Sequence, residues 1–388
     1  MTRWPTVLLA LGGGIIAAAH FGKMPPSLPD LRADLDLSLV EGGWAVSIFS
    51  LIGLIFGILT GSVVDSFGAR RILAIGLVLL ALGSILGSFA DGGAFLLSTR
   101  ALEGIGFLSA AVAGGALIAQ SSSTDDLKLS LGLWSTYMPA GSALMILASP
   151  VILDSFGWRG LFQLIAGLSL FWAALLFRGS KPAERHRTSW STLPGNFKTI
   201  LTVPGPAILS ICFALYTFQW VTLMVWLPSA MIETKGLSTS LAAMLTAIIV
   251  AANIIGNLGA GWIQHRGAAR WMILAGGALL MALSAQGIFS DALPDLIRFV
   301  LCLVFSAAGG MLPGAILSGA PAVSPTPSLI GTTNGLIVQG SHLGQMIGPP
   351  IVAAIVSATG LWASSVWVMN GAAAAIVVLA FLTRRLSL

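Results

Sequence analysis

Residues 44–90 read WAVSIFSLIGLIFGILTGSVVDSFGARRILAIGLVLLALGSILGSFA, two apolar runs joined by a short connection that ends in Arg70 and Arg71. Each run is long enough to cross the roughly 30 Å hydrocarbon core of a bilayer as a helix, which takes about 20 apolar residues. Apolar runs separated by short segments rich in polar residues, glycine or proline continue along the whole chain. The sequence therefore predicts an all-α membrane protein.

The composition supports this prediction and excludes several function classes. Of 388 residues, 56% are hydrophobic and 9% are charged, with a mean hydropathy of +0.94, whereas soluble domains carry about 25% charged residues. Cys212 and Cys302 lie far apart in apolar runs, which argues against a disulfide framework or a metal cluster. The net charge of +5 comes from scattered basic residues with no aromatic–basic groove. We expect no nucleic-acid partner, no metal and no cofactor.

Twelve transmembrane helices are predicted in two series of six. The first apolar run follows Arg3 and ends near Ala17-Ala18-Ala19, as a signal peptide would, but it leads into further spans and is better explained as a first transmembrane helix. The runs are residues 5–25, 44–64, 72–90, 94–119, 129–152 and 160–177, then 204–231, 238–261, 270–289, 296–319, 331–356 and 361–382. We expect two six-helix bundles with pseudo-two-fold symmetry, 1–177 and 204–388, joined by a basic cytoplasmic linker, 178–203.

Basic residues indicate the orientation in the membrane. Lys and Arg concentrate in short cytoplasmic loops, and with the amino terminus inside they gather in the cytoplasmic connections, while acidic residues predominate outside. This arrangement predicts a multi-pass protein of the inner (cytoplasmic) membrane with both termini in the cytoplasm.

The two halves of the sequence share repeated features. Gly132-Leu133 followed by Gly141 has the same spacing as Gly335-Leu336 followed by Gly344, and Arg100 opens the fourth span much as Arg298 opens the tenth. Repeated bundles are typical of secondary transporters, whose substrate binds near the midplane between the repeats.

The connection Gly61-Ser-Val-Val-Asp65-Ser-Phe-Gly68-Ala-Arg70-Arg71 resembles the signature loop of the major facilitator superfamily. Further matches are Arg100, Gly104 and Gly106, Gly157-Trp158-Arg159, and a degraded second copy of the loop at Gly261, Gly267 and Arg270. The segment 334–350, with Trp134 and Tyr137-Met138-Pro139, is similar to the cyanate and nitroimidazole transporter-like branch. The resemblance covers the whole chain and implies alternating access by a protein that functions as a monomer.

The resemblance also implies a gate on the cytoplasmic side. In the superfamily this loop holds the cytoplasmic side closed, which implies gating roles for Gly61, Asp65, Gly68, Arg70 and Arg71. The alternative is that the basic pair only sets the topology.

Charged residues inside the predicted spans are candidates for a transport site. Arg100 and Glu103 are three residues apart on one helix face, where an unpaired charge would cost at least about 2.5–3.5 kcal/mol, so we expect them to compensate each other. Glu103, with Arg100, is a candidate for proton coupling, and a structural ion pair is the alternative. Lys23, three residues after His20, and Arg298 are further candidates for substrate binding, although both lie near helix ends where such side chains can reach the interface.

Polar and aromatic side chains within the spans complete the expected cavity lining. The substrate-binding candidates are Lys23, Arg100, Tyr137, Tyr216, Gln219, Trp220, Arg298, Asn334, His342 and Gln345. Hydrogen bonding between helices is the alternative role for the uncharged members. His342 is a second candidate for proton coupling because histidine titrates near neutral pH.

These charges favour an anionic or neutral substrate. Arginine can bind a carboxylate through two hydrogen bonds, and the first span carries no acidic residue of the kind found in many exporters of cationic drugs. The predicted function is proton-coupled transport of a small organic or inorganic anion, and the alternative is a proton-driven multidrug exporter. A receptor or membrane enzyme on a transporter scaffold is the third hypothesis, and the sequence argues against it because the chain has no HExxH motif, nucleophile elbow or phosphate-binding loop.

Overall fold

The computed structural model describes residues 1–178, 199–290, 292–326 and 329–385, apart from the side chains of a few residues such as Asp65 and Lys128. Within these ranges the chain is helical, with short turns and no strand. Of the predicted linker 178–203, residues 179–198 lie outside the described residues.

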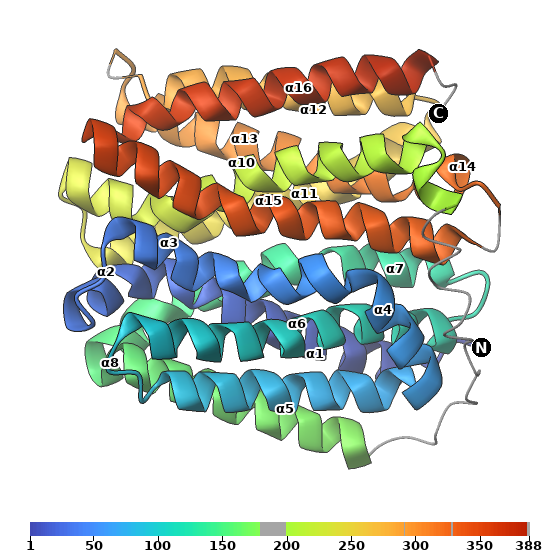
Figure 1. Ribbon diagram of the computed structural model, residues 1–388, viewed down its shortest axis with the longest axis horizontal. Coiled ribbons are helices and arrows are strands. Elements are labelled where there is room, and N and C mark those ends of the chain that lie inside the picture. The colour runs from blue at the N-terminus through green and yellow to red at the C-terminus, as the bar shows by residue number, and fades with distance from the viewer. Residues whose placement is uncertain (179–198, 291, 327–328, 386–388) are drawn as a thin grey trace. The chain divides into compact units, whose positions relative to one another are not determined.

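The first six predicted spans correspond to eight α-helices and one 3₁₀ turn, and the α-helices can be followed in Figure 1. They are α1 (Trp4–Gly22) with α2 (Met24–Asp34); α3 (Leu39–Ser47), η1 (Ile48–Ser50) and α4 (Leu51–Phe67); α5 (Ala69–Gly87); α6 (Gly93–Ser121); and α7 (Leu127–Ser135) with α8 (Tyr137–Arg178), which supplies two spans.

The last six predicted spans also correspond to helices of the structure. They are α10 (Pro204–Lys235), α11 (Thr239–His265), α12 (Arg270–Ile288), α13 (Asp295–Leu317), α15 (Ile330–Thr359), and η4 (Trp362–Ser364) with α16 (Ser365–Arg385); the short α14 (Ala320–Val323) precedes α15.

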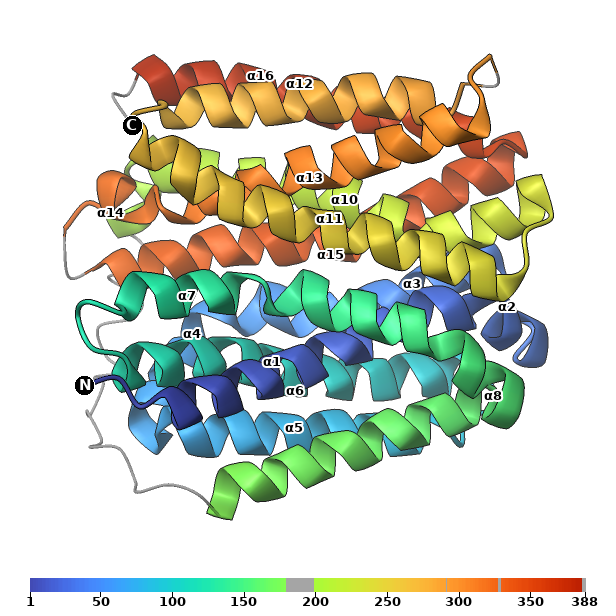
Figure 2. The same cartoon turned by 180° about the vertical axis from the view of Figure 1, so that it is seen from behind.

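The twelve-span prediction is confirmed. Ten stretches in the described chain are long and apolar enough to cross a membrane on those criteria alone. One of them is the 42-residue α8, which contains a non-helical break at Gly157 (φ 64°) and turns back on itself, so that it provides two spans (Figure 2). The less apolar α15, 30 residues long, supplies the twelfth.

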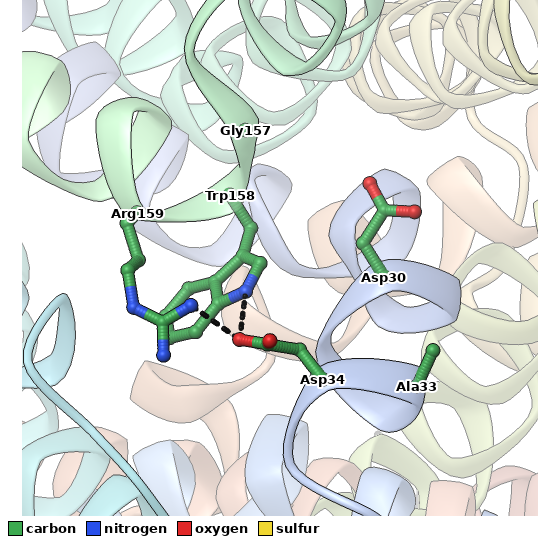
Figure 3. Close-up of a pocket in the computed structure, with 6 residues that line it drawn as sticks. All are labelled: Asp30, Ala33, Asp34, Gly157, Trp158 and Arg159. Carbon is green, nitrogen blue, oxygen red and sulfur yellow. Dashed lines mark hydrogen bonds and ion pairs between the residues drawn. The ribbon is translucent and has the colours of Figure 1, made fainter.

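The turn at Gly157 is fixed by the two residues after it. Gly157 adopts a positive φ that other residues rarely tolerate. The Trp158 indole nitrogen donates to Asp34 Oδ2 over 3.0 Å, and Arg159 forms an ion pair with the same carboxylate (Figure 3). Arg159 also donates to the Ala90 carbonyl over 3.0 Å. These contacts tie the end of α2 to the break in α8.

The described residues fall into two compact units, one from Met1–Trp190 and Leu227–Ala247 and the other from Ser191–Trp226 and Ile248–Leu388. In the first unit α5 packs on α6 and α8, and α1 packs on α8 and α6. In the second, α12 packs on α13 and α16. The predicted division into bundles 1–177 and 204–388 stays a prediction.

Gly141 and Gly344, which occupy equivalent positions in the two halves of the sequence, also make equivalent packing contacts. A Cβ at Gly141 would lie 2.2 Å from the Ile15 carbonyl oxygen in the first unit, and one at Gly344 would lie 2.0 Å from the Ala214 carbonyl oxygen in the second. In both units a glycine on the fifth span therefore lets the backbone of the first span come close.

Candidate functional site

A cluster of charged side chains lies in the interior of the first unit, on α1, its junction with α2, and α6. We define the charge cluster as His20, Lys23, Arg100 and Glu103, all of which have 0% exposed surface. Charged groups are costly in a membrane interior unless they pair or have a function, so this cluster is the first candidate for a transport site.

Local breaks in the helices bring these groups together. Lys23 separates α1 from α2, and Pro25 and Pro26 follow in the first turn of α2, where proline removes helical hydrogen bonds. The second span is interrupted by the 3₁₀ turn η1, which carries Phe49. A Cβ at Gly104 would lie 2.3 Å from the Phe49 carbonyl oxygen, so glycine there allows this turn to approach α6.

Glu103 is the centre of the charge cluster. Lys23 Nζ donates to Glu103 Oε1 over 2.9 Å and to Oε2 over 3.0 Å. Arg100 Nη1 donates to Oε2 over 2.5 Å, and His20 Nδ1 lies 3.1 Å from the same oxygen. The contact expected between Arg100 and Glu103 is present, and two cations share one carboxylate.

Hydroxyl groups and aromatic rings complete the surroundings. Lys23 Nζ donates to Ser84 Oγ over 2.7 Å, and Ser84 in turn donates to the Phe162 carbonyl. His20 Nε2 lies 2.8 Å from Ser169 Oγ. Lys23 Nζ lies 3.6 Å from the centre of the Phe162 ring, and Arg100 lies 4.6 Å from that of Phe49, contacts that favour cations.

Arg100 has spare donor capacity. Its Nε donates to the Ala45 carbonyl over 3.1 Å, and its Nη1 to the His20 carbonyl over 3.4 Å as well as to Glu103. Its Nη2 is buried and has no hydrogen-bond partner among the described residues. A buried donor without a partner costs free energy, which an incoming acceptor would recover.

Tyr137 lies in the first unit beside an aromatic row. Its ring stacks on Trp134 with centroids 4.3 Å apart, and Phe107 lies between it and Phe49 at centroid distances of 6.5 Å and 4.8 Å.

The second unit holds a polar cluster without charge. We define the neutral cluster as Tyr216, Trp220, Asn253, Asn257 and Ser306. Asn253 Nδ2 lies 3.1 Å from the Tyr216 hydroxyl and 3.0 Å from the Ser306 carbonyl. Trp220 donates to Ser306 Oγ over 3.0 Å, and Asn257 donates to Asn253 Oδ1 over 2.7 Å. Two predicted residues, Tyr216 and Trp220, therefore form satisfied contacts between helices.

The other predicted residues of the second unit are Gln219, Arg298, Asn334, His342 and Gln345. Gln219 and Gln345 each donate within their own helix, to the Leu215 carbonyl over 3.1 Å and to Ser341 Oγ over 3.0 Å. Polar atoms of Gln219 (Oε1), Asn334 (Oδ1) and His342 (Nδ1) are buried without a partner in the described part of the chain. Arg298 donates to the Ile288 carbonyl over 2.8 Å, at the start of α13.

The predicted gating residues lie around the α4–α5 turn. Gly61 and Asp65 are on α4, the side chain of Asp65 is outside the description, and Gly68 makes the turn with φ 87°. Arg70 donates through Nε to the Leu176 carbonyl near the end of α8, and Arg71 is exposed. Their gating role stays a prediction.

Sequence reasoning missed His20 as a member of the charge cluster, and it missed Ser84 and Ser169. The spacing of His20 and Lys23 on one helix face was the available signal, but the hydroxyl partners come from α5 and α8. Their positions depend on tertiary packing, which a single sequence does not reveal.

Comparison with known proteins identifies the family. The model of the Major Facilitator Superfamily matches residues 9–344 and, in a second match, 209–387. The chain belongs to this superfamily. It is accordingly a multi-pass membrane transporter and not an enzyme.

Several relatives align over nearly the whole chain. A hexuronate transporter of Bacillus subtilis is 25% identical, covering 96% of this chain and 92% of the relative. The human monocarboxylate transporter 11 is 26% identical, covering 91% and 79%. Two relatives whose names refer to drug resistance or efflux match over shorter shares, 56% and 41% of this chain.

A solved structure has the same fold. The bacterial homologue of the human lysosomal transporter Spinster, in an inward-facing and occupied conformation, superposes with a TM-score of 0.79 at 16% identity, covering 99% of this chain and 97% of that one.

Proposed function

We propose that the protein is a proton-coupled transporter of a small anion, organic or inorganic, that works by alternating access in the inner membrane with both termini in the cytoplasm. The observation that carries the proposal is the charge cluster, in which Lys23 and Arg100 surround the single carboxylate Glu103 and Arg100 Nη2 has no partner among the described residues. The cluster has one positive charge in excess, which an anion would balance.

The relatives support an anionic substrate. Hexuronates and monocarboxylates carry a carboxylate, and the transporters named for them align over most of this chain. An arginine donor in a dry site binds a carboxylate strongly. The finer likeness of residues 334–350 to the cyanate and nitroimidazole transporter-like branch stays a prediction.

Thermal stabilisation of the purified protein tests the proposal, because a ligand that binds the folded state raises its melting temperature. Glucuronate, lactate, nitrate and a cationic dye are compared at pH 5.5 and 7.5. We expect an anion to stabilise the protein, more strongly at pH 5.5 than at pH 7.5. The stabilisation should disappear in Arg100→Ala. It should weaken in Arg100→Lys, because lysine keeps the positive charge but lacks the planar guanidinium that offers two parallel donors.

Arg266→Ala is the matched control, because Arg266 is exposed and its guanidinium lies over the ring of Trp262. This variant should bind anions as the wild type does. Stabilisation by the dye alone would overturn the proposal and favour the multidrug exporter. Uptake of the stabilising anion into proteoliposomes under an imposed proton gradient then tests proton coupling. An uptake rate that does not change with the gradient would contradict it.

A further inference from the structure

The imidazole of His20 is held between a carboxylate and a hydroxyl. Its Nδ1 lies 3.1 Å from Glu103 Oε2 and its Nε2 lies 2.8 Å from Ser169 Oγ. Ser169 Oγ also lies 2.9 Å from the Ile165 carbonyl, one turn back on α8. The charged groups that act on the imidazole are Glu103 and Arg100 from α6 and Lys23 from the end of α1, while α8 contributes only an uncharged hydroxyl.

The three hydrogens of the Lys23 ammonium group are already committed to hydrogen bonds. Ser84 donates its hydrogen to the Phe162 carbonyl, so it accepts from Lys23. Lys23 therefore donates to Ser84 and to both oxygens of Glu103, which takes all three hydrogens of an ammonium group. Loss of a proton from Lys23 would break one of these bonds, and arginine stays protonated in proteins.

Glu103 is also a poor acceptor for a further proton. Lys23 and Arg100 both donate to it, so a proton on the carboxylate would face two cations and replace charge-assisted hydrogen bonds, which are the stronger kind.

His20 differs because both of its protonation states can be fully hydrogen-bonded. In the neutral state Nδ1–H donates to Glu103, and Nε2 accepts from the Ser169 hydroxyl. In the charged state Nε2–H donates to Ser169 Oγ, and the Ser169 hydroxyl turns to donate to the Ile165 carbonyl. The distances suit both arrangements, since a serine hydroxyl is both donor and acceptor.

We propose that the coupling proton binds to Nε2 of His20 and that Ser169 is the positioning residue that makes this possible. This inference rests on the proposed function, because a proton on His20 is a coupling proton only in a proton-coupled transporter. Lys23, Arg100 and Glu103 together carry one net positive charge, and a proton on His20 raises it to two. The proton therefore strengthens anion binding, and the anion strengthens proton binding by the same factor.

Nuclear magnetic resonance of ¹⁵N-histidine-labelled protein tests the site with protons as the only ligand. The chain has four histidines, and the signals of His20 are identified by their absence in His20→Gln. We expect Nε2 of His20 to gain a proton as the pH is lowered from 8.5 to 4.5, while Nδ1 keeps its hydrogen throughout.

Variants of two serines separate positioning from general packing. Ser169→Ala removes a partner that the charged imidazole needs more than the neutral one, so proton affinity at His20 should fall about tenfold. Ser169→Thr keeps a hydroxyl and should restore most of it. Ser149→Ala is the matched control, because Ser149 is equally buried on α8 and bonds only to the Met145 carbonyl in the described structure.

The outcomes separate this inference from the proposed function. A His20 signal that stays neutral over the whole pH range, or an unchanged midpoint in Ser169→Ala, would overturn the proton site even if an anion binds. A His20 that titrates as expected in a protein that no anion stabilises would uphold the proton site and overturn the proposed function.

Discussion

The two units contain buried polar clusters on corresponding helices, and the clusters differ in charge. In the first unit the charge cluster lies on the first and fourth spans, α1 and α6, whereas the neutral cluster of the second unit lies on the seventh, eighth and tenth, α10, α11 and α13. Among the described residues, Arg100 of the charge cluster has a donor without a partner, whereas the hydrogen bonds of the neutral cluster are satisfied. We therefore expect the charge cluster to act in ion binding and the neutral cluster to hold helices together.

The largest effect that tests this contrast is expected from Glu103→Gln. The substitution leaves Lys23 and Arg100 buried without a carboxylate, and removing one partner of a buried pair costs about 3–5 kcal/mol. We expect a large fall in the melting temperature in detergent.

A triple variant shows whether charge or packing causes that fall. Lys23→Met, Arg100→Met and Glu103→Leu together remove every charge of the cluster except that of a protonated His20, and replacing buried ion pairs with apolar groups is often neutral for stability. This variant should be more stable than Glu103→Gln and should bind no anion. A triple variant that is less stable than the single one would contradict the view that the cluster is kept for function.

The sequence was sufficient for the fold and for part of the site. Helical spans follow from local apolar runs, and the pairing of Arg100 with Glu103 follows from their spacing on one helix. The partners of Lys23 and His20 come from residues 61 to 149 positions away, and the hydrogen bond between Tyr216 and Asn253 likewise needs the packed helices.

An intermediate effect is expected at the two glycines that the units share. Gly141→Ala and Gly344→Ala would each place a methyl group within about 2.2 Å of a backbone oxygen of the neighbouring helix, and such overpacking costs about 1–3 kcal/mol. Similar losses of thermal stability in both variants would show that the two units use the same helix contact.

Gly167→Ala and Gly371→Ala are matched controls, because a Cβ at either position would meet nothing within 4 Å. Both should change stability by about 1 kcal/mol or less. If Gly344→Ala behaved like Gly371→Ala while Gly141→Ala did not, the resemblance between the units would be limited to sequence.

The smallest effect is expected from Asn253→Ala. The variant loses the bonds from Asn253 to the Tyr216 hydroxyl and the Ser306 carbonyl, and such bonds between membrane helices average about 0.6 kcal/mol each. It also removes the oxygen to which Asn257 donates within α11. Stability should fall by about 1–2 kcal/mol, slightly more than in Thr383→Ala, which removes one local bond from a buried hydroxyl of α16. Anion stabilisation and its pH dependence should be unchanged, because no charge is altered. If Asn253→Ala abolished the anion response that depends on Arg100, the neutral cluster would take part in substrate binding, and cohesion would not be its only role.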